Sequence, residues 1–178
     1  MKKIKPQTPL VNLELTYLDL ILEQVFFYTK ENLDSGRQKE GPSPTVQDIA
    51  DHSMLPVEKV IQRLQNIVKI SQQALLSQRQ FDDILQKLIV SYKQSGAESL
   101  EWTIYDLSTE KNLCVTYGFV QLFELYSFHE LIGVLSPFSL RSSEQKIIFV
   151  CENGNKSYSA ALYLRECGMK NVFYTHLT

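Results

Sequence analysis

The chain has 178 residues, of which 44% are hydrophobic and 21% are charged, and its formal net charge at pH 7 is −2. This balance excludes a chain that is disordered throughout, and the length is compatible with one domain or with two small ones. No apolar run approaches a membrane span, and the start MKKIKPQTP lacks the apolar core of a signal peptide, so we expect a cytoplasmic protein with no membrane partner.

The composition and spacing of the apolar residues divide the chain into two parts. Residues 10–95 are rich in Leu, Gln and Ile at helical spacing, whereas residues 102–178 contain β-branched and aromatic runs such as TIYDL and KIIFVC. The segment SGAES, residues 95–99, predicts the joint between a helical domain over 1–95 and a second domain over 100–178. Residues 1–95 carry 12 Lys and Arg against 11 Asp and Glu, so the helical domain is only slightly basic.

The first predicted element is a long helix that the polar loop at Ser35 and Gly36 ends. One side of this helix is expected to carry Leu13, Tyr17, Leu20, Ile21, Gln24 and Phe27 or Tyr28, most of which are apolar or aromatic.

The run PTVQDIADHSMLPVEKVIQRLQNIV, residues 44–68, predicts two helices joined by a turn. Thr45 is a candidate N-cap with Asp48 as its capping-box partner, and Pro56 suits the first turn of the second helix. The pair is expected to pack through Ile49, Val60 and Leu64. After it, a further helix is predicted by the apolar positions Phe81, Ile84, Leu85, Leu88, Ile89 and Tyr92.

The helix pair resembles the helix-turn-helix of DNA-binding proteins and is similar to the helical region of bacterial sigma factors over about 20 residues. Met54 stands where glycine is usual and Ser53 where a core apolar residue is usual, so we expect either a wider turn or an unrelated helix pair. The resemblance implies a DNA-binding surface on the second helix, and a helical bundle that packs or dimerises is the alternative. The residues of that surface would be Lys59, Gln62 and Arg63.

The run KIIFVCENGNKSYSAALYLRECGMKNVFY, residues 146–174, reads as a strand, a small polar loop, a helix and a second strand. Because an uninterrupted apolar strand implies cover on both faces, residues 147–150 are expected to form the central strand of a parallel α/β sheet. Cys151 would then end a buried strand at the positive end of a helix dipole. Such a position favours thiolate over thiol.

This run resembles the rhodanese family, whose active loop is a cysteine followed by a short glycine-containing turn and a cationic residue, commonly CRSGxRS. Here the loop reads Cys151, Glu152, Asn153, Gly154, Asn155, Lys156 and Ser157. The upstream run HELIGVLSPFSL is similar to the family's GHIPGAxNIPFSEL segment at His129, Pro137, Phe138 and Ser139. The resemblance covers roughly residues 100–178 and implies a rhodanese-like α/β domain.

The resemblance implies a sulfur-transfer mechanism. Cys151 would take sulfane sulfur from a donor and become a persulfide, and a thiol acceptor or cyanide would remove that sulfur. Lys156 would be an electrostatic partner, and the backbone amides of residues 153–157 would hold the terminal sulfur. No cofactor is implied. The three cysteines, Cys114, Cys151 and Cys167, are odd in number and form no CxxC pair, so they are expected to be reduced thiols without a metal.

Three departures from the family pattern weaken an enzymatic role. The usual Asp-x-Arg is replaced by Gly118, Phe119 and Val120. Glu152 replaces the usual loop arginine and opposes both a thiolate and an anionic sulfur donor. The sequence ends at THLT, where the family continues into a last helix, so we expect one face of the sheet to be less covered.

Two classes of function therefore remain open. The first is a sulfur-handling enzyme or persulfide carrier with a helical accessory domain. The second is a regulator or adaptor in which a weakened rhodanese-like domain senses a reactive sulfur or oxidant, while the helical domain binds DNA or a protein partner. In both readings Cys151 is the reactive residue, and a buried structural cysteine at a strand end is the alternative for it.

Overall fold

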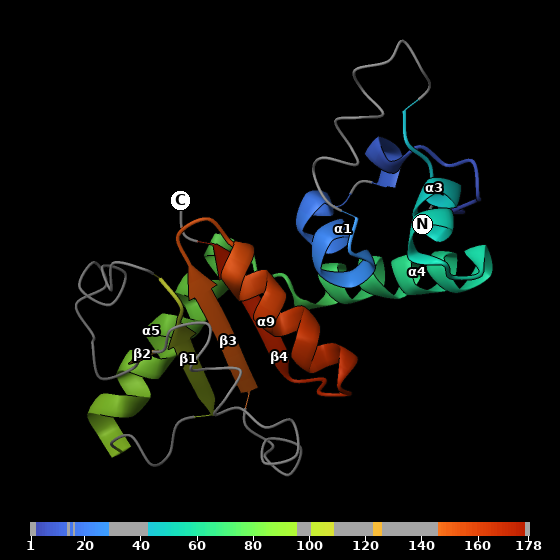
Figure 1. Ribbon diagram of the computed structural model, residues 1–178. Coiled ribbons are helices and arrows are strands. Elements are labelled where there is room, and N and C mark those ends of the chain that lie inside the picture. The colour runs from blue at the N-terminus through green and yellow to red at the C-terminus, as the bar shows by residue number, and fades with distance from the viewer. Residues whose placement is uncertain are drawn as a thin grey trace. The chain divides into compact units, whose positions relative to one another are not determined.

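The computed structural model describes residues 3–13, 15, 17–28, 43–95, 101–108, 123–125 and 146–176. The chain forms two compact units, Met1–Lys69 and Ile70–Thr178, whose elements are drawn in Figure 1. Among the helices of these residues, none combines the length and the apolar character that crossing a bilayer requires.

The division between the units differs from the boundary that the sequence suggested. It falls within helix α4, Val57–Ala74, and not in the segment 95–99. The reason is tertiary, since helix α5, Gln78–Ser95, packs on the sheet of the second unit through an apolar stripe. A helical residue pattern alone does not show which element the helix packs against.

The first unit contains the 3-10 turn η1, Leu10–Leu13, and the helices α1, Leu18–Phe26, and α3, Val46–Ser53. The N-terminal segment is tied to the start of α3 by backbone hydrogen bonds. The N–H of Leu10 donates to the carbonyl of Pro44 over 2.8 Å, and the N–H of Val46 donates to the carbonyl of Thr8 over 3.1 Å.

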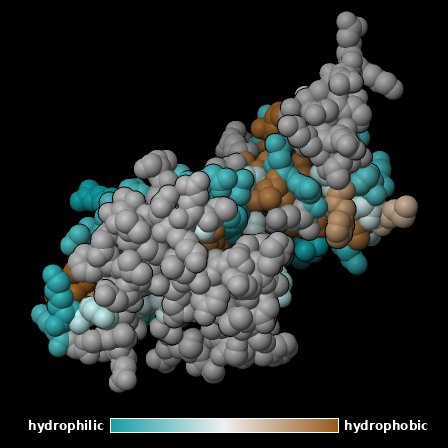
Figure 2. All heavy atoms as spheres, turned by 60° about the vertical axis from the view of Figure 1, so that its left-hand side comes forward, coloured by the Kyte–Doolittle hydropathy of each residue, from teal (hydrophilic) through white to brown (hydrophobic). Residues whose placement is uncertain are grey.

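The prediction of one long first helix is wrong. A separate turn precedes α1, and α1 ends where Phe27 adopts a left-handed conformation with φ 55°. The N–H of Phe27 then donates to Glu23 O, and the N–H of Tyr28 donates to Leu22 O over 2.9 Å, which satisfies carbonyls that the helix end leaves open. Phe27 is 78% exposed, and Figure 2 shows hydrophobic residues at the surface as brown patches among hydrophilic ones.

Helices α3 and α4 are two helices with a turn between them. The capping box of Thr45 and Asp48 is confirmed, with the backbone N–H of Thr45 donating to Asp48 Oδ2 over 2.6 Å. The three residues expected to pack the pair together are fully buried, namely Ile49, Val60 and Leu64.

The turn after α3 holds a methionine in the left-handed backbone conformation that favours glycine. Met54 has φ 53° and ψ 32°, in the left-handed region, and its side chain is 92% exposed. The half-buried hydroxyl of Ser53 donates to the carbonyl of Ile49 over 2.6 Å, so this polar residue is satisfied at the end of the helix. A left-handed residue costs free energy when it carries a side chain, and Met54 gains little contact in return.

We therefore predict that Met54→Gly stabilises the first unit. The free energy of unfolding should rise by about 0.5–1 kcal/mol, because glycine adopts this conformation without steric cost. Denaturant unfolding followed by circular dichroism measures the change. Met54→Ala is the matched control, since it removes the exposed side chain but keeps the Cβ. An equal gain from Ala and Gly would contradict the strain argument.

The second unit is built on a sheet of four parallel strands in the order β2–β1–β3–β4. The strands are β1, Trp102–Asp106, β2, Phe123–Leu125, β3, Lys146–Cys151, and β4, Val172–His176. Because β3 lies between β1 and β4, the prediction that residues 147–150 form a central parallel strand is confirmed. Together with the helices, this sheet makes the unit an α/β structure.

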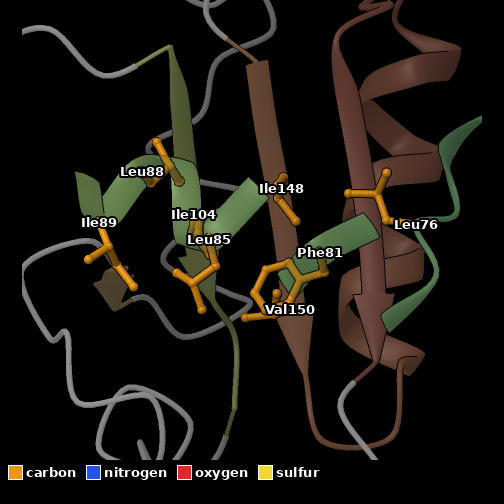
Figure 3. Packing of buried hydrophobic residues seen from close by; sticks show 8 residues of the cluster. All are labelled: Leu76, Phe81, Leu85, Leu88, Ile89, Ile104, Ile148 and Val150. Atoms are coloured by element: carbon orange, nitrogen blue, oxygen red, sulfur yellow. The ribbon is translucent and has the colours of Figure 1, made fainter. Parts of the chain in front are cut away.

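Two helices bury opposite faces of β3. On one face, Ile148 and Val150 join a core cluster with residues of α5 and β1, and Figure 3 shows how these side chains meet. On the other face lies helix α9, Asn155–Glu166, whose Tyr158 ring meets the Tyr174 ring edge-on at 5.2 Å. The sequence predicted less cover on one face without saying which, and the structure shows α5 packed on the face of Ile148 and Val150. The cluster comprises Leu76, Phe81, Leu85, Leu88, Ile89, Ile104, Ile148 and Val150.

The outer edge of β4 is also paired. The N–H of Leu76 donates to the carbonyl of Tyr174 over 2.9 Å, and the hydroxyl of Thr175 donates to the carbonyl of Leu76 over 3.0 Å. The segment between α4 and α5 therefore fixes the end of β4 at which the candidate site lies.

Candidate functional site at the carboxyl end of the central strand

Cys151 is the last residue of β3, and its side chain is fully buried. Residues 152–154 form the loop, and α9 begins at Asn155. The order of strand, short loop and helix expected from the sequence is present. In open parallel sheets, ligands bind at the carboxyl ends of the strands, and this is where Cys151 lies.

The loop depends on one glycine and one asparagine. Gly154 precedes α9 with φ 79°, a conformation that favours glycine, and its carbonyl accepts the N–H of Tyr158 over 2.9 Å. The side chain of Asn153 turns back onto the loop, where its Oδ1 accepts the N–H of Asn155 over 3.1 Å. These two residues set the close approach of the helix N-terminus to the strand end.

The sulfur of Cys151 contacts the first turn of α9. The backbone N–H of Ser157 donates to Sγ over 3.4 Å, and Ser157 Oγ lies 3.4 Å from the same sulfur. Asn153 Oδ1 lies 3.9 Å from it. Of the backbone amides expected to hold the sulfur, the structure therefore brings that of Ser157 into contact with it.

The hydroxyl of Ser157 joins three parts of the site. It lies 3.1 Å from the carbonyl of Gly154 and 3.0 Å from the carbonyl of Thr175, both of which can only accept a hydrogen bond. While its single proton points to either carbonyl, the oxygen can only accept from the thiol of Cys151. Rotation of the hydroxyl toward the sulfur would instead give a thiolate or persulfide a second donor beside the N–H.

The charged side chains that follow Cys151 differ in exposure. Glu152 is exposed, as are Asn153 and Asn155. Lys156 is half-buried, and its Nζ donates to the carbonyl of Leu107, one residue beyond β1, over 3.3 Å. The Lys156 cation, in the first turn of α9, is thus held at the same edge of the sheet as the sulfur.

The neighbouring strand ends add polar groups that the sequence interpretation missed. On the β1 side, Asp106 is buried, and its Oδ1 accepts the N–H of Ser108 over 2.9 Å. On the β4 side, His176 is the register partner of Cys151. The available signal was that Asp106 and His176 each end an apolar strand, since the ends of parallel strands meet at one edge.

Other predicted residues lie elsewhere. The segments with His129, Pro137, Phe138 and Ser139, the tripeptide 118–120 and Cys114 are outside the described residues. Cys167 is half-buried at the C-cap of α9 and forms no disulfide within the described residues. Lys59, Gln62 and Arg63 belong to the first unit and are exposed on α4. Within the described ranges, no three His, Cys, Asp or Glu residues gather as metal ligands would.

Comparisons with family models, with curated proteins and with solved structures find no match to this chain. The structure defines a small α/β unit with a parallel sheet. A cysteine lies at the carboxyl end of its central strand, beside the N-terminus of a helix.

We predict that Ser157→Ala destabilises the second unit more than a neighbouring serine substitution does. The change removes a buried hydroxyl that satisfies a loop or β4 carbonyl, which should cost about 1–3 kcal/mol of unfolding free energy. Ser159→Ala is the matched control, because its hydroxyl donates to a carbonyl of its own helix, Asn155 O, over 2.9 Å, and its loss should cost roughly 0.5 kcal/mol or less. Denaturant unfolding compares the two, and equal losses would contradict the bridging role of Ser157.

Proposed function

We propose that this chain is a rhodanese-like sulfur-handling protein that carries a persulfide on Cys151. The observation that carries the proposal is the position of this thiol, at the end of a central parallel strand with its sulfur accepting the Ser157 N–H at the start of α9. The likeness of residues 151–157 to the rhodanese loop CRSGxRS supports the same sulfur-transfer reaction. A helix N-terminus favours negative charge, and a persulfide is anionic.

The transfer balances without a cofactor. The Cys151 thiolate attacks the outer sulfur of a sulfane-sulfur donor such as thiosulfate, a sulfur–sulfur bond forms at Cys151, and sulfite leaves with the electron pair of the broken bond. The thiol proton is lost before the attack. A thiol acceptor or cyanide then attacks the terminal sulfur and regenerates the Cys151 thiolate.

The charges of the loop limit this activity toward anionic donors. Glu152 is exposed beside Cys151 in the chain, and its negative charge opposes the approach of thiosulfate. Lys156 supplies a cation at the sheet edge, but an ammonium is a point charge without the planar fork of arginine. Turnover with thiosulfate is therefore slow in the native chain.

Replacement of Glu152 tests the charge argument. Glu152→Arg should raise the turnover of thiosulfate by roughly tenfold, because reversal of the charge draws the anion to the site. Cys151→Ser should abolish turnover in both backgrounds. Thiocyanate formation from cyanide and thiosulfate is the assay.

The matched control is Glu166→Arg, which makes the same charge change at an exposed position at the far end of α9. It should leave turnover unchanged. Activity that survives Cys151→Ser would refute the persulfide on this residue, and an equal gain from both arginine variants would refute the local role of Glu152.

A second function is supported by the exposed face of α4. In the alternative, the chain is a regulator or adaptor in which Cys151 senses a reactive sulfur or oxidant and the helical part binds DNA or a protein partner. The observation in its favour is that Lys59, Gln62 and Arg63 are all exposed on the helix that follows the Met54 turn. Arg63 also covers the Phe26 ring at 5.9 Å, so its guanidinium has a defined position on the unit.

Binding to duplex DNA tests this alternative. We expect a gel shift at low salt that is weakened by Lys59→Ala and by Arg63→Ala. Each change should also reduce the slope of log affinity against log salt by about one, which corresponds to one lost phosphate contact. Lys87→Ala, which removes an exposed lysine from α5, is the control and should bind as the parent does. The absence of a shift at low salt would favour a helical bundle or a protein partner.

A further inference from the structure

His176 lies beside Cys151 across the sheet. The two residues are register partners in the parallel pairing of β3 and β4, so their side chains project to the same face. That face is the one covered by α9, because Tyr174, two positions earlier in β4, packs on Tyr158 of α9. The imidazole and the thiol therefore project from neighbouring strands to the same face, the one on which Ser157 contacts the sulfur.

The edge also holds buried polar atoms that lack a partner. Within the described part of the chain, the buried side-chain atoms without a hydrogen bond are His176 Nδ1 and Ser108 Oγ. Ser108 follows β1 and His176 ends β4, and these two strands flank β3, so the two atoms lie on either side of the strand that carries Cys151. Buried polar atoms are normally paired, and two exceptions at one sheet edge indicate a place where a further group binds or a proton moves.

We infer that His176 accepts the thiol proton of Cys151 when the sulfur becomes a nucleophile. Neutral imidazole has one nitrogen free to accept a proton, and proton transfer by a positioned histidine is the common means of activating a thiol. Ser157 cannot take this role, because a serine hydroxyl that gained the proton would be a strong acid. The inference rests on the proposed function for its substrate, a sulfane-sulfur donor.

The proton balance of the sulfur-transfer step then closes within the site. His176 holds the proton as imidazolium while Cys151 attacks the donor and sulfite departs. The imidazolium charge lies beside the persulfide anion and favours it, in addition to the Ser157 N–H. When an acceptor thiolate or cyanide removes the terminal sulfur, the proton returns from His176 to the Cys151 thiolate.

The test measures the rate of persulfide formation on Cys151 in the full chain with thiosulfate, by mass spectrometry of the Cys151 peptide. His176→Ala should lower this rate by roughly 100-fold, and added imidazole should restore part of it, since a free base can replace the missing proton acceptor. His176→Gln keeps a polar side chain of similar size and should be as slow as His176→Ala. His52→Ala, a histidine change in the first unit, should leave the rate unchanged.

A second readout separates this inference from the proposed function. Alkylation of Cys151 by iodoacetamide also needs loss of the thiol proton but no sulfane sulfur, so it should slow in both His176 variants and be rescued by imidazole. If persulfide forms at equal rates in native and His176 variants, the role of His176 is overturned while the proposed function stands. If no persulfide forms but alkylation depends on His176, the proposed function is overturned while the role of His176 as proton acceptor stands.

A folding defect would give a different pattern. Circular dichroism checks that His176→Gln is folded, and a slow rate without imidazole rescue in that folded variant would overturn proton transfer in favour of a structural role. If no persulfide forms and the alkylation rate is the same in the native chain and in the His176 variants, both proposals are overturned.

Discussion

Burial of β3 on both faces is the constraint on which the second unit depends. Ile148 and Val150 face α5, and Phe149 faces α9 with its ring stacked on Tyr105 at 5.5 Å. Each such side chain contributes about 1.5–3 kcal/mol when it is fully buried. Cover on both faces is typical of a strand inside a parallel sheet, and because β3 and β4 are parallel, the connection between them crosses one face as a helix.

That crossover creates the candidate site. The chain leaves β3 at Cys151, turns at Gly154 and enters α9 at once, so the helix N-terminus lies against the strand end. Ser157 then links the sulfur, the loop carbonyl of Gly154 and the β4 carbonyl of Thr175. The hydroxyl stabilises the unit when its proton faces a carbonyl, and under the proposed function it would stabilise a thiolate or persulfide when its proton faces the sulfur. This arrangement fits a structural cysteine as well as a reactive one.

The sequence predicted those features whose signals are local. The apolar run before Cys151, the glycine at position 154 and the capping box of Thr45 and Asp48 each leave a pattern within a few residues, and each is present. The end of α1 was not predicted, because an aromatic residue at left-handed φ, Phe27, carries no such pattern.

Features that depend on tertiary pairing were also beyond the sequence. An apolar stripe on α5 fits a bundle as well as a sheet, and only the packing of Phe81 against β-strand residues decides between them. The contact of Lys156 with Leu107 and the register of His176 with Cys151 depend on how distant strands align. Comparison of strand ends across the predicted sheet would have found His176, since parallel strands bring their carboxyl ends together.

The most direct test of the account is to map where sulfane sulfur is held in the folded chain. The protein is treated briefly with a sulfane-sulfur donor, persulfides are blocked, and each cysteine peptide is examined for the mass of one added sulfur atom. Cys167 is a demanding internal comparison, because it is half-buried and therefore more accessible than the fully buried Cys151. We predict that the added sulfur is on Cys151 despite its burial. Added sulfur on Cys167 with none on Cys151 would contradict it and leave Cys151 as a structural residue of the core.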